Sequence, residues 1–394
     1  MTTSKDNCPI CDSEDISILI ETTDVPINCN RLYLTFEDAI KSSRGNLRLA
    51  FCYCCGHLFN TRFDPELTEY APGYENALHF SPRFQEYAEL LAHTLVQRYN
   101  LYEKQIIEIG CGNGFFLNML CSLGNNRGIG FDPSFNSDLA NDTAGYNFTV
   151  IQDYYSEKYS NYKADLICCR HVLEHIKFPK DLLATVHQAN DHGDATAMFF
   201  EVPNLMFTLK GLGIWDLIYE HCHYFSKKSL ARLFSSCGFQ IVELYEKFEG
   251  QFLGIEVETA QNHSSTGDDF LTSTFSMNNY VTTFAEKYKN KVSYWKHHLE
   301  DMKRENNRAA IWGGGSKGTT FLNVLGISDQ IRYVIDINPR KHGSYVACTG
   351  QRIMPPTFLK ELRPDTILVM NPIYLKEIER TTSELGVNAR LISV

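Results

Sequence analysis

The sequence lacks a long apolar run. No uninterrupted stretch approaches the ~20 apolar residues that a membrane-spanning helix needs, and residues 1–6 lack the apolar core of a signal peptide. Proline- or glycine-rich linkers and low-complexity tracts are missing as well. These absences predict a folded cytoplasmic protein that has no membrane partner.

An excess of positive charge is also missing. Lys and Arg number 37 against 47 Asp and Glu, which gives a formal net charge of −10, and this charge is spread along the chain. A nucleic-acid-binding surface normally carries a basic cluster, so the composition argues against nucleic acid as a partner. An anionic small molecule would need local positive groups.

The chain has the length and composition of a globular protein with more than one domain. Its 394 residues exceed the usual size of one domain, and 43% of them are hydrophobic. Changes in pattern along the chain predict three units: an N-terminal unit at 1–70, a central domain at 71–270 and a C-terminal domain at 271–394.

Thirteen cysteines are many for the cytosol, where disulfides seldom persist. Two Cys-x-x-Cys pairs, 40 residues apart, can supply four thiolates to one tetrahedral Zn²⁺. The four cysteines are Cys8, Cys11, Cys52 and Cys55. Cys54 and His57 offer another pair of ligands, and unligated thiols are a further alternative. Protein ligands would fill all four coordination positions of the ion, which is typical of a structural site. We therefore expect an N-terminal unit that binds a structural Zn²⁺.

The central region alternates short apolar runs with helical patterns, beginning with a one-sided helical pattern at 82–99. Four runs have the length and character of buried strands: 106–109, 128–131, 166–169 and 198–202. This alternation predicts a parallel sheet in a doubly wound, Rossmann-like α/β domain. Residues 252–258 alternate in polarity and predict an antiparallel edge strand.

The C-terminal region repeats this kind of pattern. A long amphipathic helix is predicted at 275–305. Strand patterns follow at 309–312, 333–336 and 366–370, and a glycine-rich turn follows the first of them. We therefore expect a second α/β domain.

A glycine loop in the central domain has the features of a ligand-binding turn. At Gly110, Gly112 and Gly114 the chain passes from strand to helix, and backbone N–H groups there can approach an anionic group. Phe115 occupies the position of the third glycine of a dinucleotide fingerprint, which weakens a nicotinamide interpretation. Asp132, at the end of the next strand, can accept ribose hydroxyls. A purely structural turn is the alternative.

The run Glu-x-Gly-x-Gly-x-Gly from Glu108, with the downstream Asp132, resembles motif I of class I methyltransferases. The resemblance implies S-adenosylmethionine as cofactor, with its methionine part on the loop and its amine near Glu108. Asp153 is a candidate for the adenine amino group, although a surface-turn aspartate fits equally well. The expected cofactor residues are Glu108, Gly110, Cys111, Gly112, Gly114, Asp132, Pro133, Asp153, Tyr154, Arg170 and His171.

Two polar segments follow predicted strands and are candidates for catalysis. Residues 170–176 come directly after the strand at 166–169, at the sheet edge where α/β domains bind ligands. Residues 219–225 bring an acid, two imidazoles and two phenols together, which a buried strand would not tolerate without partners. We favour His221 as general base, with His223 as its rival.

Over nearly its whole length the chain resembles the zinc-containing C-methyltransferases that act on nucleotide-linked 4-keto deoxysugars. The matching motifs are the two cysteine pairs, Arg-His-Val-x-x-His at 170–175, Glu-His-x-x-Tyr-Phe at 220–225, and the C-terminal segments at 317–320, 336–343, 349–356 and 371–378. The resemblance implies deoxysugar biosynthesis through proton removal beside a ketone and methylation of the enolate carbon. It assigns the base to His221, with Tyr219, Glu220, His171 and His175 positioning it or polarising the ketone.

The acceptor is accordingly expected to be a nucleotide sugar, bound by a monomer or homodimer. The expected substrate residues are Tyr74, Asn204, His223, Ser316, Lys317, Asn371 and Tyr374. Lys317 and the preceding glycines can bind a pyrophosphate, or can form a structural turn only. O- or N-methylation of another small metabolite is the enzymatic alternative, and a non-catalytic cofactor-binding scaffold is the other.

Overall fold

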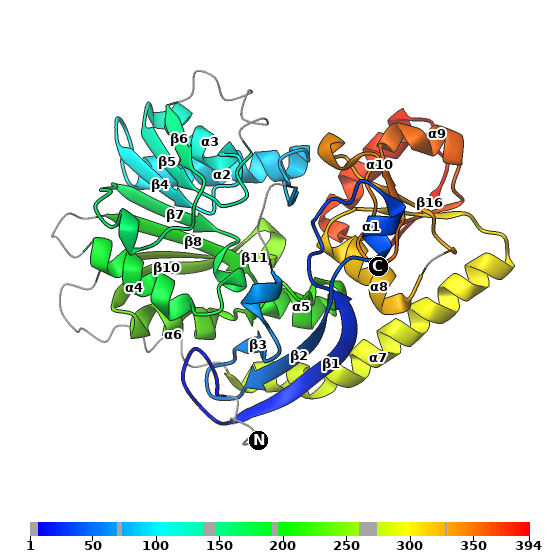
Figure 1. Cartoon of the computed structure of the whole chain (residues 1–394), viewed down its shortest axis with the longest axis horizontal. Coiled ribbons are helices and arrows are strands. Elements are labelled where there is room, and N and C mark those ends of the chain that lie inside the picture. Colours follow the sequence, from blue (N-terminus) through cyan, green and yellow to red (C-terminus); the bar gives the residue numbers. More distant parts are fainter. Residues whose placement is uncertain (1–6, 69–72, 137–146, 191–195, 260–273, 328) are drawn as a thin grey trace.

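The computed structural model describes residues 7–68, 73–136, 147–190, 196–259, 274–327 and 329–394. Within these residues the chain forms three sheets (Figure 1). The central domain, in cyan and green, and the C-terminal domain, in orange and red, lie side by side, and the blue N-terminal strands lie below and between them. The expected domain limits at 70 and 270 fall outside the described residues.

The N-terminal sheet is antiparallel, with the order β1-β2-β3-β9. Its elements are β1 (Ile16–Pro26), α1 (Phe36–Ile40), β2 (Arg44–Cys52), β3 (Leu58–Asn60) and β9 (His223–Tyr224). Because β9 comes from the central part of the chain, the sheet joins the N-terminal unit to the polar segment at 219–225.

The central sheet has seven strands in the order β10-β11-β8-β7-β4-β5-β6. They are β4 (Gln105–Ile109), β5 (Arg127–Phe131), β6 (Phe148–Ile151), β7 (Leu166–Arg170), β8 (Ala197–Pro203), β10 (Phe239–Lys247) and β11 (Phe252–Thr259). The five strands from β8 to β6 are parallel. β11 is antiparallel as predicted, but it is not an edge strand, because β10 pairs with its outer side.

Helices cover both faces of this sheet, which confirms the doubly wound architecture. The covering helices are α2 (Pro82–Arg98), α3 (Phe115–Gly124), α4 (Pro179–Ala189) and α6 (Lys227–Ser236), whereas α5 (Leu205–Gly211) packs in a different core. Apolar side chains of α2 and α3 pack on one face, and those of α4 and α6 pack on the other. The strand order reverses at β4, which pairs with β5 on one side and β7 on the other, and ligands of such sheets bind beside this point.

The C-terminal domain is a second α/β unit, as the repeated pattern predicts. Its parallel sheet has the order β14-β13-β12-β15-β16. The elements are α7 (Thr274–Arg304), β12 (Ala309–Trp312), α8 (Ser316–Leu325), β13 (Tyr333–Ile335), β14 (Arg352–Met354), α9 (Leu359–Leu362), β15 (Thr366–Val369), α10 (Leu375–Glu384) and β16 (Arg390–Ser393).

Helix α7 connects the units. Its apolar side chains, among them Phe284, Trp295 and Leu299, join a core that also includes residues of β1, β2, α5 and α8. Figure 1 shows α7 running along the lower side of the molecule beneath the C-terminal domain. The three units thus share buried surface.

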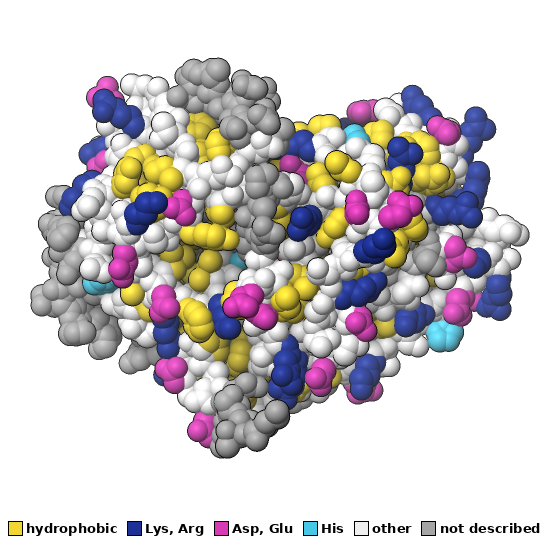
Figure 2. All heavy atoms as spheres, in the orientation of Figure 1, with side chains coloured by type: hydrophobic (Ala, Val, Ile, Leu, Met, Phe, Trp, Pro, Cys, Tyr) yellow, Lys and Arg dark blue, Asp and Glu magenta, His cyan; other side chains and the backbone are white. Residues whose placement is uncertain are grey.

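On the face shown in Figure 2, acidic and basic side chains are interspersed, in keeping with the spread of charge along the sequence. Among the described helices, none is both long and apolar enough to cross a membrane.

Candidate active site and cofactor pocket

A cavity of about 260 Å³ opens beside the carboxyl ends of β4, β5 and β7, where the strand order reverses. Gly110 and Gly112 form its floor in left-handed backbone, with φ of 71° and 55°. At Gly110 a Cβ would lie 2.0 Å from a methyl of Val172, so a side chain does not fit. The Gly112 N–H donates to Asp132 Oδ2 at 2.7 Å.

Glu108 lies on the wall of this cofactor pocket with only 3% of its surface exposed. Its Oε2 has no hydrogen-bond partner among the described residues. Burial raises the pKa of the carboxyl to about 8, although Arg170 acts against this shift. An unpartnered carboxyl oxygen beside a glycine cradle fits a ligand that presents an ammonium group, as the methionine part of S-adenosylmethionine does.

The pocket contains every sequence-predicted cofactor residue except Gly114. Gly114 precedes α3 with φ 81°, and a Cβ there would lie 2.5 Å from the Phe148 ring. Asp153 lies on the pocket wall, with Oδ2 accepting from Tyr159 at 2.6 Å and from Lys158 at 3.0 Å.

A second cavity, of about 290 Å³, lies between the central and C-terminal domains, and we call it the acceptor cavity. Tyr74, His171 and His175 line both cavities, so the two adjoin. The predicted substrate residues on the acceptor cavity are Tyr74, Asn204, Ser316, Lys317, Asn371 and Tyr374. Lys317 also forms an ion pair with Asp216.

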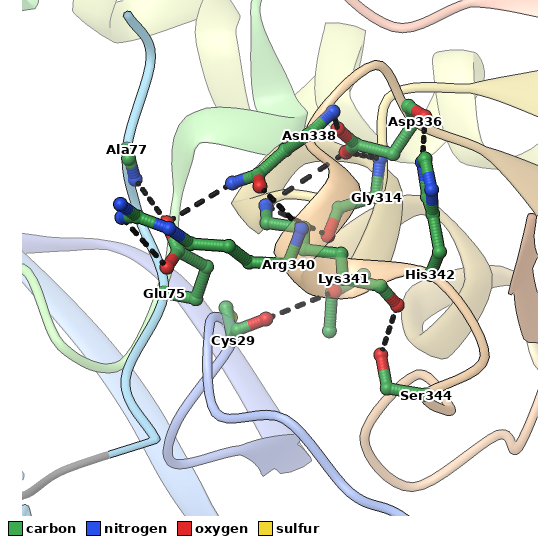
Figure 3. A network of polar contacts seen from close by, with 11 residues as sticks. Cys29, Glu75, Ala77, Gly314, Asp336, Asn338, Arg340, Lys341, His342 and Ser344 are labelled. Carbon is green, nitrogen blue, oxygen red and sulfur yellow. Dashed lines mark hydrogen bonds and ion pairs between the residues drawn. The ribbon is translucent and has the colours of Figure 1, made fainter. Parts of the chain in front are cut away.

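The C-terminal wall of the acceptor cavity is held by the polar network drawn in Figure 3. Asp336 accepts the N–H of Gly314 at 2.8 Å, and the Lys341 ammonium donates to the Gly314 carbonyl at 3.3 Å. Glu75 reaches this network from the segment before α2 and accepts from Asn338 at 3.0 Å. The segment that carries Tyr74 is thereby tied to the C-terminal domain.

His171 stands where the two cavities meet, in left-handed backbone with φ 56°. Its backbone N–H donates to the Glu201 carbonyl at 2.9 Å, and its Nε2 lies 3.0 Å from Glu201 Oε1. Arg170 donates to the same oxygen from Nε at 3.0 Å and from Nη2 at 2.8 Å. Burial opposes ionisation of Glu201, but Arg170 and His171 outweigh it and lower the pKa to about 2.

His175 and His221 face one another on the acceptor cavity, with ring centroids 4.8 Å apart. Nδ1 of His175 lies 3.1 Å from the Glu220 carbonyl oxygen. Burial lowers the pKa of His175 to about 4. Burial, together with His175, His171 and Lys317, holds the pKa of His221 well below its usual value. Both imidazoles are therefore neutral at pH 7 and able to accept a proton.

Glu174 is the residue that sequence reasoning missed. It lines the acceptor cavity and is 1% exposed, and ligand atoms of Glu174, His175 and His221 lie within 4.8 Å of one another. The sequence did hold one indication of a functional role: Glu174 lies between His171 and His175, within the candidate segment at 170–176. Nothing in the sequence showed that the short 3₁₀ turn Leu173–His175 directs the Glu174 carboxyl into the cavity.

Three of the predicted catalytic or substrate residues line neither cavity: Tyr219, Glu220 and His223. Tyr219 is buried against Gly45, and its hydroxyl accepts the Asp64 N–H at 2.9 Å. The Glu220 carboxyl turns toward the N-terminal unit and accepts the Cys29 N–H at 2.8 Å. Tyr219 and Glu220 lie in a turn before β9, and their hydrogen bonds to the N-terminal unit direct both side chains away from the acceptor cavity.

His223, the rival base and predicted substrate residue, is a packing residue. It is 3% exposed, its Nδ1 lies 3.0 Å from His57 Nε2, and its Nε2 lies 3.3 Å from the Lys177 carbonyl oxygen. The other ring nitrogen of His57 lies 3.4 Å from Ser229 Oγ. Both imidazoles are thus engaged within the protein, which removes His57 as a metal ligand.

The four predicted cysteines meet at one point of the N-terminal unit, all within 4.8 Å of one another. Cys8 Sγ lies 3.5 Å from Cys55 Sγ, and Cys11 Sγ lies 3.6 Å from Cys52 Sγ. These separations are too long for disulfides, whereas four thiolates at about 2.3 Å from one tetrahedral Zn²⁺ stand roughly 3.8 Å apart. The donor set and its spacing fit a metal. Cys54 is exposed and lies outside the cluster.

Two family profiles match the chain. A methyltransferase domain matches residues 80–244, which include most residues that line the cofactor pocket and the two polar segments at 170–176 and 219–225. A C-methyltransferase C-terminal domain matches residues 271–392. The chain is a methyltransferase that uses S-adenosylmethionine. Its glycine loop, Glu108 and Asp132 all lie within the first match.

Three solved structures that are similar to the methyltransferase each cover less than half of its chain. The 1,6-didemethyltoxoflavin-N1-methyltransferase of Burkholderia thailandensis, with bound S-adenosylhomocysteine, is 14% identical and covers 45% of this chain and 80% of its own, at a TM-score of 0.36. The magnesium protoporphyrin IX methyltransferase of Synechocystis is 18% identical, with coverages of 48% and 90% and a TM-score of 0.35. An S-adenosylmethionine-dependent methyltransferase of Aquifex aeolicus is 13% identical, with coverages of 46% and 94% and a TM-score of 0.35. Among curated proteins no relative matches.

Proposed function

We propose that the methyltransferase methylates a carbon next to the ketone of a nucleotide-linked 4-keto deoxysugar. The observation that supports this best is the neutral imidazole of His221 on the wall of the acceptor cavity, beside His171 and His175, which also line the cofactor pocket. Methylation of carbon requires a base that removes a C–H proton. The base must be unprotonated for that step, and the lowered pKa of His221 keeps its imidazole unprotonated at pH 7.

The cofactor pocket would hold S-adenosylmethionine, with the glycine loop, Glu108 and Asp132 as its main contacts. When bound there, the cofactor would supply an electrophilic methyl group to the acceptor carbon. Arg170, fixed by Glu201 under the pocket, and His171 keep the junction of the two cavities rigid. Alignment of the acceptor carbon with the methyl group would supply much of the rate, because well-oriented reactants reach high effective concentrations.

The C-terminal domain would bind the nucleotide diphosphate. Ser316 and Lys317 begin α8, a helix of 10 residues whose N-terminus faces the acceptor cavity. Backbone N–H groups at such a terminus and the Lys317 ammonium suit phosphate oxygens. Asn371 and Tyr374 stand on the same wall, and Asn371 donates to Gln251 at 3.1 Å.

We also propose that Cys8, Cys11, Cys52 and Cys55 bind one structural Zn²⁺. Protein thiolates would fill all four positions, so the ion would have no open position for substrate. The site stands apart from both cavities, as none of the four cysteines lines either one.

Incubation with S-adenosylmethionine and a panel of thymidine-, uridine-, cytidine- and guanosine-diphosphate-linked 4-keto deoxysugars tests the proposed reaction. We expect one panel member to gain the mass of one methyl group. In D₂O without cofactor, the same acceptor should exchange a proton next to the ketone for deuterium, which an O- or N-methyltransferase would not cause. Methylation of hydroxyl or amino groups without such exchange would exclude the proposal.

A further inference from the structure

Four acidic side chains line the acceptor cavity among the residues that the structure describes: Glu174, Asp216, Asp336 and Glu377. Three of them have partners. Asp216 pairs with Lys317, Asp336 accepts the Gly314 N–H, and Glu377 accepts from the Ser81 hydroxyl at 2.6 Å. Glu174 differs, because its Oε2 is fully buried and has no hydrogen-bond partner within the described part of the chain.

The surroundings of Glu174 disfavour a negative charge. The carboxyl is 1% exposed, and burial raises its pKa to about 8; the residue's own backbone N–H acts against this shift, and the nearby Glu201 adds to it. His171 Nδ1 lies 3.8 Å from Oε1, too far for a hydrogen bond. Among the described residues, the ionisable groups near this carboxyl include Cys169, His171, His175, Glu201, His221 and Cys222.

The position of Glu174 relative to His221 suits a single carbonyl substrate. In such a substrate, the ketone oxygen and the hydrogen on the neighbouring carbon are separated by only three bonds, the C–H bond included. A base and an acid whose atoms lie within 4.8 Å of each other can therefore contact the hydrogen and the oxygen of the same molecule. A protonated carboxyl is an O–H donor, whereas a carboxylate only accepts hydrogen bonds. Buried acids that stay protonated at neutral pH are known to stabilise enolates in this way.

We propose that Glu174 is a catalytic acid, whose protonated carboxyl donates a hydrogen bond to the acceptor's ketone oxygen while His221 removes the neighbouring proton. This inference rests on the proposed reaction. The C–H bond breaks, its proton goes to the His221 ring, and its electron pair forms the enolate double bond. The carbonyl π electrons move to oxygen, where the Glu174 O–H stabilises the charge. Once the carbon has gained the methyl group, the carbonyl reforms and His221 releases its proton to solvent.

Substitution of Glu174 tests the role through kinetics. Loss of one donor to a developing oxyanion costs roughly 10²–10³ in turnover, so Glu174→Ala should lower kcat by that factor with little change in the acceptor KM. Glu174→Gln keeps an amide donor and should lose less. Because the protonated acid is needed, wild-type kcat should fall as pH rises through about 8, and Glu174→Gln should lack this alkaline decline.

The protonation state of Glu174 is measured on the free protein by infrared difference spectroscopy between wild type and Glu174→Gln. We expect a protonated-carboxyl band at pH 7 that disappears above pH 8. Glu256→Gln is the matched control, because Glu256 is as buried but accepts from Tyr245 outside both cavities. This variant should keep the alkaline decline of kcat even if it unfolds at a lower temperature.

The outcomes separate the two proposals. If the wild-type enzyme methylates no ketone-bearing acceptor, both the proposed reaction and the role of Glu174 are excluded. If the wild-type enzyme methylates the sugar, and Glu174→Gln keeps both the full kcat and the alkaline decline, only the role of Glu174 is excluded. An infrared spectrum with carboxylate bands alone at pH 7 ends it as well.

Discussion

At the scale of single residues, burial sets the chemistry of this site. The same loss of solvent lowers the pKa of His221 and raises that of Glu174, so that each is neutral at pH 7. Before the reaction, neither group places a charge in the buried site, where desolvation would make it costly. Glu201 is the exception, because the bidentate Arg170 contact keeps it ionised.

Replacing His221 with Asn should remove the base and leave both cavities formed. General-base catalysis contributes roughly 10²–10⁴-fold, so kcat and deuterium exchange should fall together by that factor. Calorimetric binding of S-adenosylhomocysteine should stay unchanged, and His93→Asn, at an exposed position of α2, is the control. In wild type, the acid-side decline of activity should lie below pH 6.5, because the base works unprotonated. Near-normal turnover of His221→Asn would remove the base assignment.

Replacing Glu201 with Gln should destabilise the fold. Arg170 would keep its buried charge without a counter-ion, which costs about 3–5 kcal/mol in comparable pairs. The pKa of Glu201 is depressed in the folded state, so its contribution is present above the unfolded-state pKa and is lost as pH falls toward about 2. Thermal unfolding from pH 7 to pH 3 should show the difference between wild type and variant shrinking. A difference that does not change with pH would contradict this account.

At the scale of elements, the sites are built where strands end. β4, β7 and β8 carry Glu108, Arg170 and Glu201, and the loop after β4 forms the cofactor cradle. The apolar runs of these strands were sufficient to predict them. The prediction that β11 is an edge strand was wrong, because alternating polarity fits any strand that has one polar face. In β11 a polar side chain is buried and has hydrogen-bond partners within the protein: Glu256 accepts from Tyr99 and Tyr245.

Substitution of Gly110 with Ala should weaken cofactor binding. Left-handed backbone alone costs an L-residue about 1–2 kcal/mol, and the new methyl group would also meet Val172. We expect the Kd for S-adenosylhomocysteine to rise roughly 10-fold or more, measured by calorimetry. Gly211→Ala, where a Cβ meets no atom within 4 Å, should bind normally. Equal affinities for the two variants would show that the loop does not hold the cofactor.

At the scale of the whole molecule, the N-terminal unit supports the active site from a distance. β3 pairs with β9, which begins two residues after His221, and the Cys29 N–H donates to the Glu220 carboxyl. The same unit contacts the C-terminal domain, where the Cys29 carbonyl accepts from Thr319 and the Tyr345 N–H donates to the Tyr33 carbonyl. Loss of structure in the N-terminal unit would therefore destabilise both walls of the acceptor cavity, the one that carries His221 and the one formed by the C-terminal domain.

Removal of the proposed zinc should test this dependence. Cys11→Ser should lower the zinc content from one ion per chain to near zero, measured by plasma mass spectrometry, and should lower Tm and kcat together. Cys54→Ser provides a neighbouring control, because that thiol is exposed and outside the cluster. Wild-type protein that holds no zinc after gentle purification, yet is fully active, would rule out the structural metal.

The sequence by itself determined the local features. Strand and helix periods, the glycine loop, and the cysteine spacing each depend on residues close together in the chain, and these predicted the three units, the cofactor residues and the cysteine cluster. Side-chain direction around His221 could not be predicted in this way. Only the tertiary structure turned Tyr219 and Glu220 toward the N-terminal unit, packed His223 against His57, and brought the Glu174 carboxyl to His221. The physical reason is that burial and partner geometry come from segments distant in sequence, and they decide which polar groups are satisfied and which remain for chemistry.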